Sequence, residues 1–233
     1  MNHTTRFAIV CLSLVFALTA NAKKPTREKL ANRIVTAEYV LEEVMANPDT
    51  AIPSAILQDA HGIILTVNYR GGFFVGGHGG QGILIAKNPI TKKWGVPAFV
   101  KTGGANLGIQ FGLKEFDAVY IIMDLDAVRK AYTGRFDLSA DAAAVAGPLY
   151  RSKEAHQSID YKNAKLLVYT SKKGLFAGVA LKAGWISPSN KATQTFYNTD
   201  YKLPEIVMSD WFELPIEATA LLQRLNYYTE GGR

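Results

Sequence analysis

The segment GGFFVGGHGGQG, residues 71–82, is the most glycine-rich part of the chain, and the apolar run ILI follows it at residues 83–85. Seven of its twelve residues are glycine. Glycine inside a strand or helix costs roughly 0.5–1 kcal/mol relative to alanine, so some structural need must offset several such costs. Three interpretations compete: a loop that cradles phosphate, a flexible linker, or strands that bend or pack closely against other backbone.

The phosphate interpretation rests on Gly77, Gly79 and Gly82, whose spacing matches a dinucleotide-binding fingerprint. That fingerprint works only between a strand and a helix N-terminus. Here a short apolar run and Asn88-Pro89 follow, which favours a strand, and residues 101–113 contain no acidic residue for a ribose. A linker would lack the apolar runs. We therefore favour a structural role in a sheet and expect Gly77→Val or Gly79→Val to destabilise the fold.

Residues 1–22 have the features of a secretion signal. Arg6 supplies the positive charge, residues 7–18 the apolar core, and Ala20-Asn21-Ala22 the cleavage site. The apolar core is shorter than the roughly 20 residues that a membrane-spanning helix needs. Cys11 lies early in this core after Val10, a poor setting for a lipid anchor. We expect cleavage after Ala22 and export to the periplasm without lipid on Cys11.

The mature chain, residues 23–233, would contain no cysteine, which excludes disulfides, thiolate metal sites and cysteine nucleophiles. Only Arg6 is charged in the first 22 residues, so 25 Lys and Arg remain against 20 Asp and Glu. This mild positive excess is compatible with an anionic surface but does not prove one. No linker or internal repeat is evident, so we expect a single domain over residues 23–233.

Helical patterns occur at both ends of the mature chain. Apolar residues recur every three or four positions over residues 26–46, with Thr26 as the cap. A short helix is expected at residues 53–59, and a C-terminal helix from Pro215 onward. Two internal helices are expected at residues 124–132 and 139–146.

Patterns typical of strands fill the middle of the chain, with turn signals at Asn88-Pro89 and Gly103-Gly104. The expected strands are residues 63–67, the glycine-rich segment, 83–86, 94–100, 108–112, 118–123, 165–170 and 175–181. This order predicts an α+β fold with an antiparallel, meander or barrel-like β-sheet core and helices at the N- and C-terminal ends.

Signatures of catalysis are not found. No metalloprotease, nucleophile-elbow or P-loop motif occurs, and we expect no cofactor and no metal site. Asp124 and Asp126 resemble a metal pair, but their position between a strand and a helix favours a cap or dipole role for Asp126. His78 could approach a ligand where glycines leave space, but a single histidine does not indicate catalysis.

In order along the chain, several motifs resemble those of the SYLF domain family. They are residues 52–53 with 60–62, 72–82, 94–97, 108–112, 142–148, 169–178 and 196–197. The similarity covers about residues 33–225. It implies binding of phosphoinositides or other anionic lipids, with a basic N-terminal helix contributing in eukaryotic members, some of which are described as actin-binding. It implies no catalytic residues.

These observations predict a non-enzymatic protein that binds anionic phospholipid head groups or membranes in the periplasm. Near an anionic leaflet each lysine contributes about 1 kcal/mol, and the effect falls off within a Debye length. The partner would be phospholipid rather than nucleic acid, and actin is not expected for an exported chain. A protein-interaction or structural envelope module and an unrecognised hydrolase remain alternatives. The candidate lipid-binding residues are Lys23, Lys24, Arg27, Lys29, Arg33, Lys92, Lys93, Trp94, Lys172 and Lys173.

Overall fold

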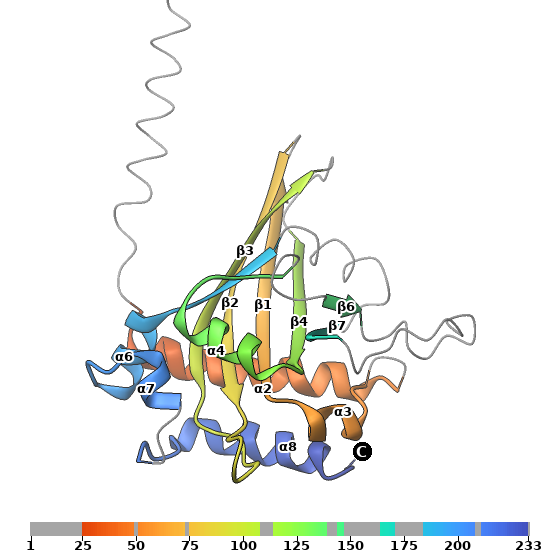
Figure 1. The fold of residues 1–233 in the computed structure, drawn as a ribbon. Coiled ribbons are helices and arrows are strands. Elements are labelled where there is room, and N and C mark those ends of the chain that lie inside the picture. Colours follow the sequence, from red (N-terminus) through yellow and green to blue (C-terminus); the bar gives the residue numbers. More distant parts are fainter. Residues whose placement is uncertain are drawn as a thin grey trace, which may run out of the picture.

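A curved β-sheet forms the centre of the protein (Figure 1). The computed structural model describes residues 25–48, 51–72, 75–107, 114–138, 144–146, 164–170, 184–207 and 211–232. Its strands are β1 (Gly62–Gly72), β2 (Val75–Ala86), β3 (Ala98–Leu107), β4 (Lys114–Ile122), β5 (Phe136–Asp137), β6 (Ala144–Ala146), β7 (Leu166–Thr170) and β8 (Gly184–Pro188). Their order across the sheet is β5-β8-β3-β2-β1-β4-β7-β6. All neighbours are antiparallel except β6 and β7, so the expected α+β, antiparallel fold is confirmed as a half-barrel.

Helices cover both faces of this sheet. The helices are α2 (Arg27–Ala46), α3 (Ser54–Asp59), α4 (Leu125–Thr133), α6 (Asn190–Tyr197), α7 (Leu203–Val207), the 3₁₀ turn η3 (Ile216–Ala218) and α8 (Thr219–Thr229). Side chains of α2, α3, α6 and α8 share one core cluster with the sheet, and those of α4 and α7 share the other. The N-terminal and C-terminal helices therefore pack in the same layer, as Figure 1 shows for α2 and α8.

The alternation of side chains along β1 explains the two clusters. Successive residues of a strand point to opposite faces, so Ile63 and Leu65 pack under α2 and α8, whereas Ile64 faces α4. All three are fully buried. A short, continuous apolar run such as residues 63–65 is what a strand buried on both faces requires.

Thr26 caps α2 as expected, since its hydroxyl accepts a hydrogen bond from the Lys29 N–H at 3.4 Å. Asp124 caps α4, since its carboxylate accepts a hydrogen bond from the Ala127 N–H at 2.8 Å. Asp126 lies in the first turn of α4 and pairs with Arg129 at 3.1 Å. The cap therefore belongs to Asp124, while Asp126 has the dipole role.

The described glycines of the glycine-rich segment lie in the sheet, as expected: Gly71 and Gly72 end β1, and the others belong to β2, which lies between β1 and β3. The close approaches are at Gly80 and Gly82. A Cβ on Gly82 would meet the Leu65 carbonyl and lie 2.8 Å from Thr66 Cγ2. At Gly77 and Gly79 the nearest atoms would be at 3.5 and 3.9 Å, which is ordinary contact. A Cβ alone therefore fits at Gly77 and Gly79, and the damage expected from the larger valine side chain at these two positions stays a prediction.

Two boundaries in the middle of the chain differ from expectation. β3 begins at Ala98 rather than at residue 94, and it continues through Gly103 and Gly104, which had been assigned to a turn. Gly103 is needed there because a Cβ would lie 2.5 Å from Cζ2 of Trp185 on β8. A glycine is required at residue 103 because the Trp185 ring packs closely against its backbone, not because the chain turns there.

Residues 144–146 were expected to be helical but form β6, so this prediction is wrong. Ala144, Val145 and Ala146 pair in parallel with Leu166, Leu167 and Val168 of β7. The pattern of an alanine-rich segment favours a helix, but pairing with a strand edge overrides that weak preference. The signal segment, the expected strands at residues 108–112 and 175–181, and residues 139–143 lie outside the described residues.

Candidate functional site

The segment between β2 and β3 forms a braced turn, residues 88–93, which we call the lysine turn. The Asn88 side chain accepts hydrogen bonds from the Ile90 and Thr91 N–H groups at 2.9 and 3.0 Å. The backbone N–H of Asn88 donates to the Lys93 carbonyl at 2.8 Å, and the Asn88 carbonyl accepts from the Lys92 N–H at 2.9 Å. Asparagine side chains often stabilise turns in this manner. The Asn88-Pro89 signal in the sequence therefore predicted this turn correctly.

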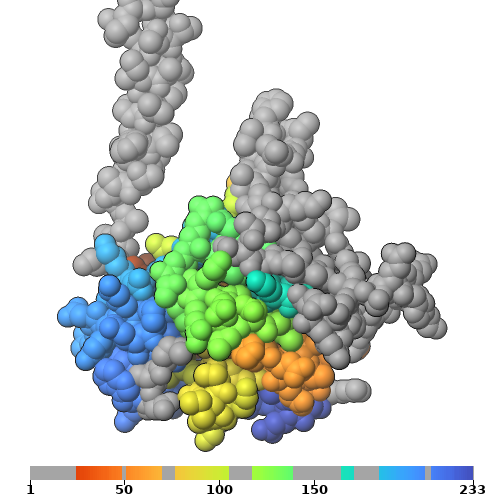
Figure 2. All heavy atoms as spheres, in the orientation of Figure 1, coloured from red at the N-terminus to blue at the C-terminus, as the bar shows by residue number. Residues whose placement is uncertain are grey.

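The tip of the lysine turn combines an apolar side chain with two cations. Ile90 is 88% exposed, and Lys92 and Lys93 are also exposed. Within the described part of the chain, no carboxylate forms an ion pair with either lysine. In Figure 2 the yellow segment that carries the turn protrudes at the lower edge, beside the blue C-terminal residues. Both charges are therefore available to an external anion.

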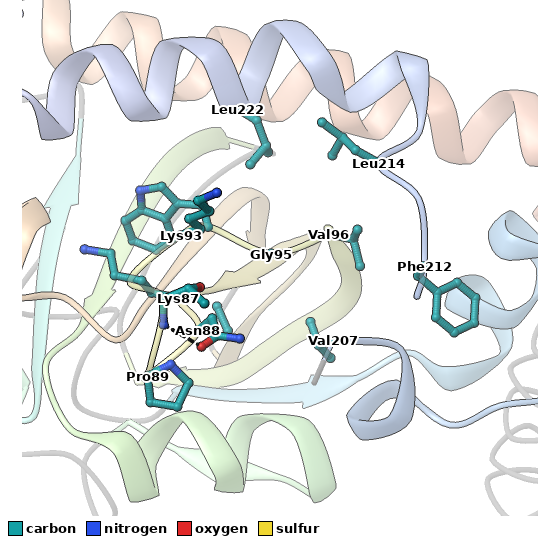
Figure 3. Close-up of a pocket in the computed structure, with 13 residues that line it drawn as sticks. Lys87, Asn88, Pro89, Lys93, Gly95, Val96, Val207, Phe212, Leu214 and Leu222 are labelled. Atoms are coloured by element: carbon teal, nitrogen blue, oxygen red, sulfur yellow. Dashed lines mark hydrogen bonds between the residues drawn. The ribbon is translucent and has the colours of Figure 1, made fainter. Parts of the chain in front are cut away.

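A groove of about 410 Å³ lies beside the lysine turn (Figure 3). Asn88, Pro89 and Lys93 line it on one side, and Phe212 and Leu214 lie on the other. Val207 of α7 and Leu222 of α8 complete its apolar wall. The groove has apolar walls and cationic groups at one end, so its lining suits an amphipathic ligand.

Lys87 also lines this groove, but its ammonium group is engaged inside the protein. The Nζ atom donates to the carbonyls of Leu57 and Gln58 at 2.7 and 2.9 Å, which caps the end of α3. The same Nζ lies 4.5 Å from the centre of the Trp94 ring. The pKa of Lys87 is lowered to about 8, chiefly by burial and also by the positive charge of Lys92, while Asp59 acts in the opposite direction.

Trp94, one of the candidate lipid-binding residues, is buried in the structure. Its side chain is only 8% exposed and belongs to the core under α2 and α8. The indole N–H donates to the Thr229 hydroxyl at 3.2 Å. Trp94 therefore holds the base of the lysine turn against α8, while Lys92 and Lys93 extend into solvent.

The basic residues at the start of α2 differ in their availability. Arg27 donates to the Glu217 carboxylate at 2.6 Å, and its guanidinium lies 4.9 Å from the centre of the Phe196 ring. Lys29 is exposed. Arg27 therefore joins α2 to η3 within the molecule. Lys29 forms no ion pair within the described residues.

Arg33 lines a separate groove of about 310 Å³ between α2 and the sheet, together with Thr36, Val67, Tyr69 and Gln81. Burial lowers the pKa of Arg33 from its ordinary value, but arginine remains charged in proteins. This groove shares no lining residue with the groove beside the lysine turn. Lys23, Lys24, Lys172 and Lys173 lie outside the described residues.

Polar side chains on the α4 face of the sheet form a closed network rather than a reactive site. The Thr66 hydroxyl donates to the Ala118 carbonyl at 3.1 Å, and Asn68 donates to Thr66 at 2.8 Å. His78 is buried on β2, opposite Arg70 on β1 and Gly104 on β3. Over the described ranges, no group of three or more His, Cys, Asp or Glu could hold a metal ion. The helices in those ranges are also too short or too polar to cross a bilayer.

One further surface was missed from the sequence. Residues 211–216, Trp-Phe-Glu-Leu-Pro-Ile, contribute Phe212 and Leu214 to the groove, and most of their apolar side chains are exposed. Large apolar residues before a helix ordinarily indicate core, and the segment is too short to show a period. Only a tertiary structure reveals that these side chains face solvent.

Comparison with known proteins identifies the family. Residues 103–228, from β3 into α8, match the Ysc84 family, described as "Las17-binding protein actin regulator". The chain is 30% identical over 185 residues to SH3 domain-containing YSC84-like protein 1 of Rattus norvegicus. It is 29% identical over 193 residues to Protein YSC84 and 30% identical over 165 residues to LAS seventeen-binding protein 3, both of Saccharomyces cerevisiae.

These alignments cover 78%, 82% and 70% of the chain but only 53%, 41% and 36% of the three relatives. The chain thus spans about half or less of the length of these three relatives. No solved structure gives a significant match. The relatives are named as binding or regulatory proteins rather than as enzymes. With more than half of its length inside the matched region, the chain belongs to the Ysc84 family, whose shared unit is the SYLF domain.

Proposed function

We propose that this protein is an exported, non-enzymatic module that binds anionic phospholipid at a membrane surface. The observation that carries the proposal is the lysine turn. It holds Lys92 and Lys93 in a fixed backbone frame beside Ile90, which is 88% exposed. An apolar side chain between cations is the chemistry of a bilayer interface, where the side chain enters the acyl boundary and ammonium groups meet phosphate.

The electrostatic part of this attachment is modest. Each lysine near an anionic leaflet contributes about 1 kcal/mol, so Lys92 and Lys93 together contribute about 2 kcal/mol. Lys29 could add to this if α2 lies near the same surface. Binding of this strength is reversible and sensitive to salt, because the Debye length falls from roughly 10 Å at 0.1 M to 3 Å at 1 M.

Vesicle co-sedimentation tests the proposal. The mature protein should pellet with vesicles containing phosphatidylglycerol and much less with pure phosphatidylcholine, and raising salt from about 0.05 to 0.5 M should weaken pelleting. The double variant Lys92→Glu/Lys93→Glu should lose most of the binding. Lys130→Glu/Lys165→Glu is the matched control, because it makes the same charge change at two exposed lysines on α4 and before β7.

Equal pelleting with both vesicle types, unaffected by salt or by the lysine-turn variant, would overturn the electrostatic proposal. Export is tested separately by the intact mass of the protein expressed with its first 22 residues. A product that begins at Lys23 supports cleavage after Ala22, whereas a lipid adduct beginning at Cys11 contradicts it.

A second candidate function is protein binding, which the names of the relatives favour. One of them is named for binding LAS seventeen, and the family description mentions actin regulation. If the purified protein bound neither vesicle type, this second candidate would become the better account of the exposed surfaces.

A further inference from the structure

Residues 211–216 form an exposed apolar surface, which we call the aromatic strip. Trp211 is 62% exposed and Ile216 is 82% exposed, and Leu214 is also exposed. Tyr201, from the segment before α7, adds another exposed ring beside Trp211. Single exposed apolar residues are common, but a contiguous group of this kind usually marks an interaction site.

The strip is an ordered surface, because its rings pack against one another. The ring centres of Trp211 and Tyr201 are 5.0 Å apart, and those of Trp211 and Phe212 are 5.1 Å apart. Phe212 in turn lies 5.6 Å from Tyr197, whose hydroxyl donates to the Pro97 carbonyl at 2.7 Å. These contacts hold the backbone while leaving the outer faces of Trp211 and Ile216 in water.

The strip also connects the two basic regions of the described chain. At one end, Phe212 and Leu214 line the groove across from Lys93 of the lysine turn (Figure 3). At the other end, Glu217 follows Ile216 directly and is paired with Arg27 at the start of α2. Among the described residues, the strip therefore has unpaired cations at its lysine-turn end and an ion pair at its other end.

From this arrangement we propose that the aromatic strip inserts into the interfacial layer of an anionic bilayer, together with Ile90. This inference rests on the proposed function and names the face that docks. The partner is a bilayer because tryptophan and tyrosine prefer the head-group level, and lysine extends from apolar surface toward phosphate. Glu213 lies within the strip, and Asp210 and Glu217 flank it in the sequence, with Glu217 neutralised by Arg27. The attraction to an anionic bilayer therefore has to come from Lys92 and Lys93.

The strip and the lysine turn contribute to binding in physically different ways. Charge attraction by Lys92 and Lys93 is screened by salt, whereas burial of Trp211 and Ile216 in the interface is not. The affinity lost on Trp211→Ser/Ile216→Ser should therefore be the same at low and high salt. The affinity lost on Lys92→Glu/Lys93→Glu should shrink as salt rises.

The test uses vesicles of phosphatidylglycerol and phosphatidylcholine with the mature protein. Trp211→Ser/Ile216→Ser should weaken binding by about tenfold or more, because two large side chains no longer leave water. Tyr39→Ser is the matched control, since Tyr39 is 70% exposed on α2 and away from the strip. Thermal unfolding of each variant shows that the fold is kept.

Tryptophan fluorescence gives a second, independent measurement. Brominated phosphatidylglycerol should quench the protein's emission, and Trp211→Phe should remove most of that quenching, because Trp94 is buried and Trp185 is half-buried within the sheet on β8. If wild type binds anionic vesicles but neither Trp211 variant changes affinity or quenching, the strip is not inserted and the proposed function still stands. If wild type binds no vesicles, both proposals fail.

The oligomeric state separates the bilayer from a second copy of the chain. Sedimentation of the wild type without lipid should show a monomer. A dimer that Trp211→Ser/Ile216→Ser converts to monomer would overturn the proposal, because the strip would then be a self-association surface.

Discussion

The Thr102 hydroxyl on β3 donates a 2.6 Å hydrogen bond to the Asn68 side chain on β1, across the strand that separates them. Gly80 of β2 is paired with Asn68 on one side and with Thr102 on the other. A Cβ at Gly80 would lie 2.6 Å from Asn68 Oδ1 and 2.7 Å from Thr102 Oγ1. Because Gly80 has no side chain, Asn68 and Thr102 can meet above it. This contact gives two buried polar groups the hydrogen-bond partners that burial requires.

Gly80→Ala should therefore destabilise the protein by about 1–3 kcal/mol, because the added methyl group displaces this hydrogen bond and overpacks the sheet. Gly79→Ala is the control, since its Cβ would have 3.9 Å to the nearest atom. Urea unfolding of both variants measures the difference. Equal losses of stability at Gly79 and Gly80 would contradict the close-packing account of this segment.

The Arg27 and Glu217 pair should stabilise the contact of α2 with η3. Arg27→Glu places two carboxylates together and should lower the free energy of unfolding by about 1 kcal/mol, a small value because exposed ion pairs are weak. Lys29→Glu, a charge reversal two residues later at an exposed position, should change it by less than about 0.5 kcal/mol. Denaturant unfolding checks both, and a larger loss from Lys29→Glu would show that the pair is not a stabilising contact.

The same pair predicts a dependence on pH. The hydrogen bond from Arg27 and a backbone hydrogen bond lower the pKa of Glu217 from its model-compound value of 4.5. A lowered folded-state pKa adds stability above the unfolded-state pKa, and this stability is lost as pH falls through the folded-state pKa. Wild type should therefore lose its advantage over Glu217→Gln on acidification. Unfolding curves of both proteins from about pH 6 to about pH 3 test this, and a constant difference would exclude the linkage.

Lys87 gives a pH dependence of the same sign, but in alkaline solution. Its folded-state pKa is lowered to about 8 by burial first, from 10.5. Between these values the unfolded chain binds the extra proton, so the unfolding free energy of wild type should rise with pH relative to Lys87→Met. At neutral pH the variant should be less stable by about 1–3 kcal/mol, because the Leu57 and Gln58 carbonyls lose their donor. A stability difference that falls between about pH 8 and pH 10 would refute this assignment.

Local features of the fold were predictable from the sequence. Thr26 and the three-and-four spacing of apolar residues predicted α2, and the apolar run that begins at Ile63 predicted a strand, which the structure shows to be buried on both faces. Asn88 and Pro89 predicted the turn that presents Lys92 and Lys93. Each of these signals depends on residues close together in the chain, where backbone preference and side-chain periodicity act directly.

Only the tertiary structure decided which residues are available to a ligand. Trp94 is buried because Thr229, 135 residues later, accepts its hydrogen bond, and Arg27 is engaged because Glu217 lies beside it. Trp211 and Ile216 are exposed although their composition indicates core. Exposure depends on which distant segments pack over a side chain, and long-range packing leaves no periodic signal in the sequence. The sequence by itself therefore determined α2, α3, α4, α8, the strands β1 to β4 and β7, and the family, but it did not determine the strand at residues 144–146. Only the tertiary structure placed residues 88–93 and 211–216 on opposite sides of one groove.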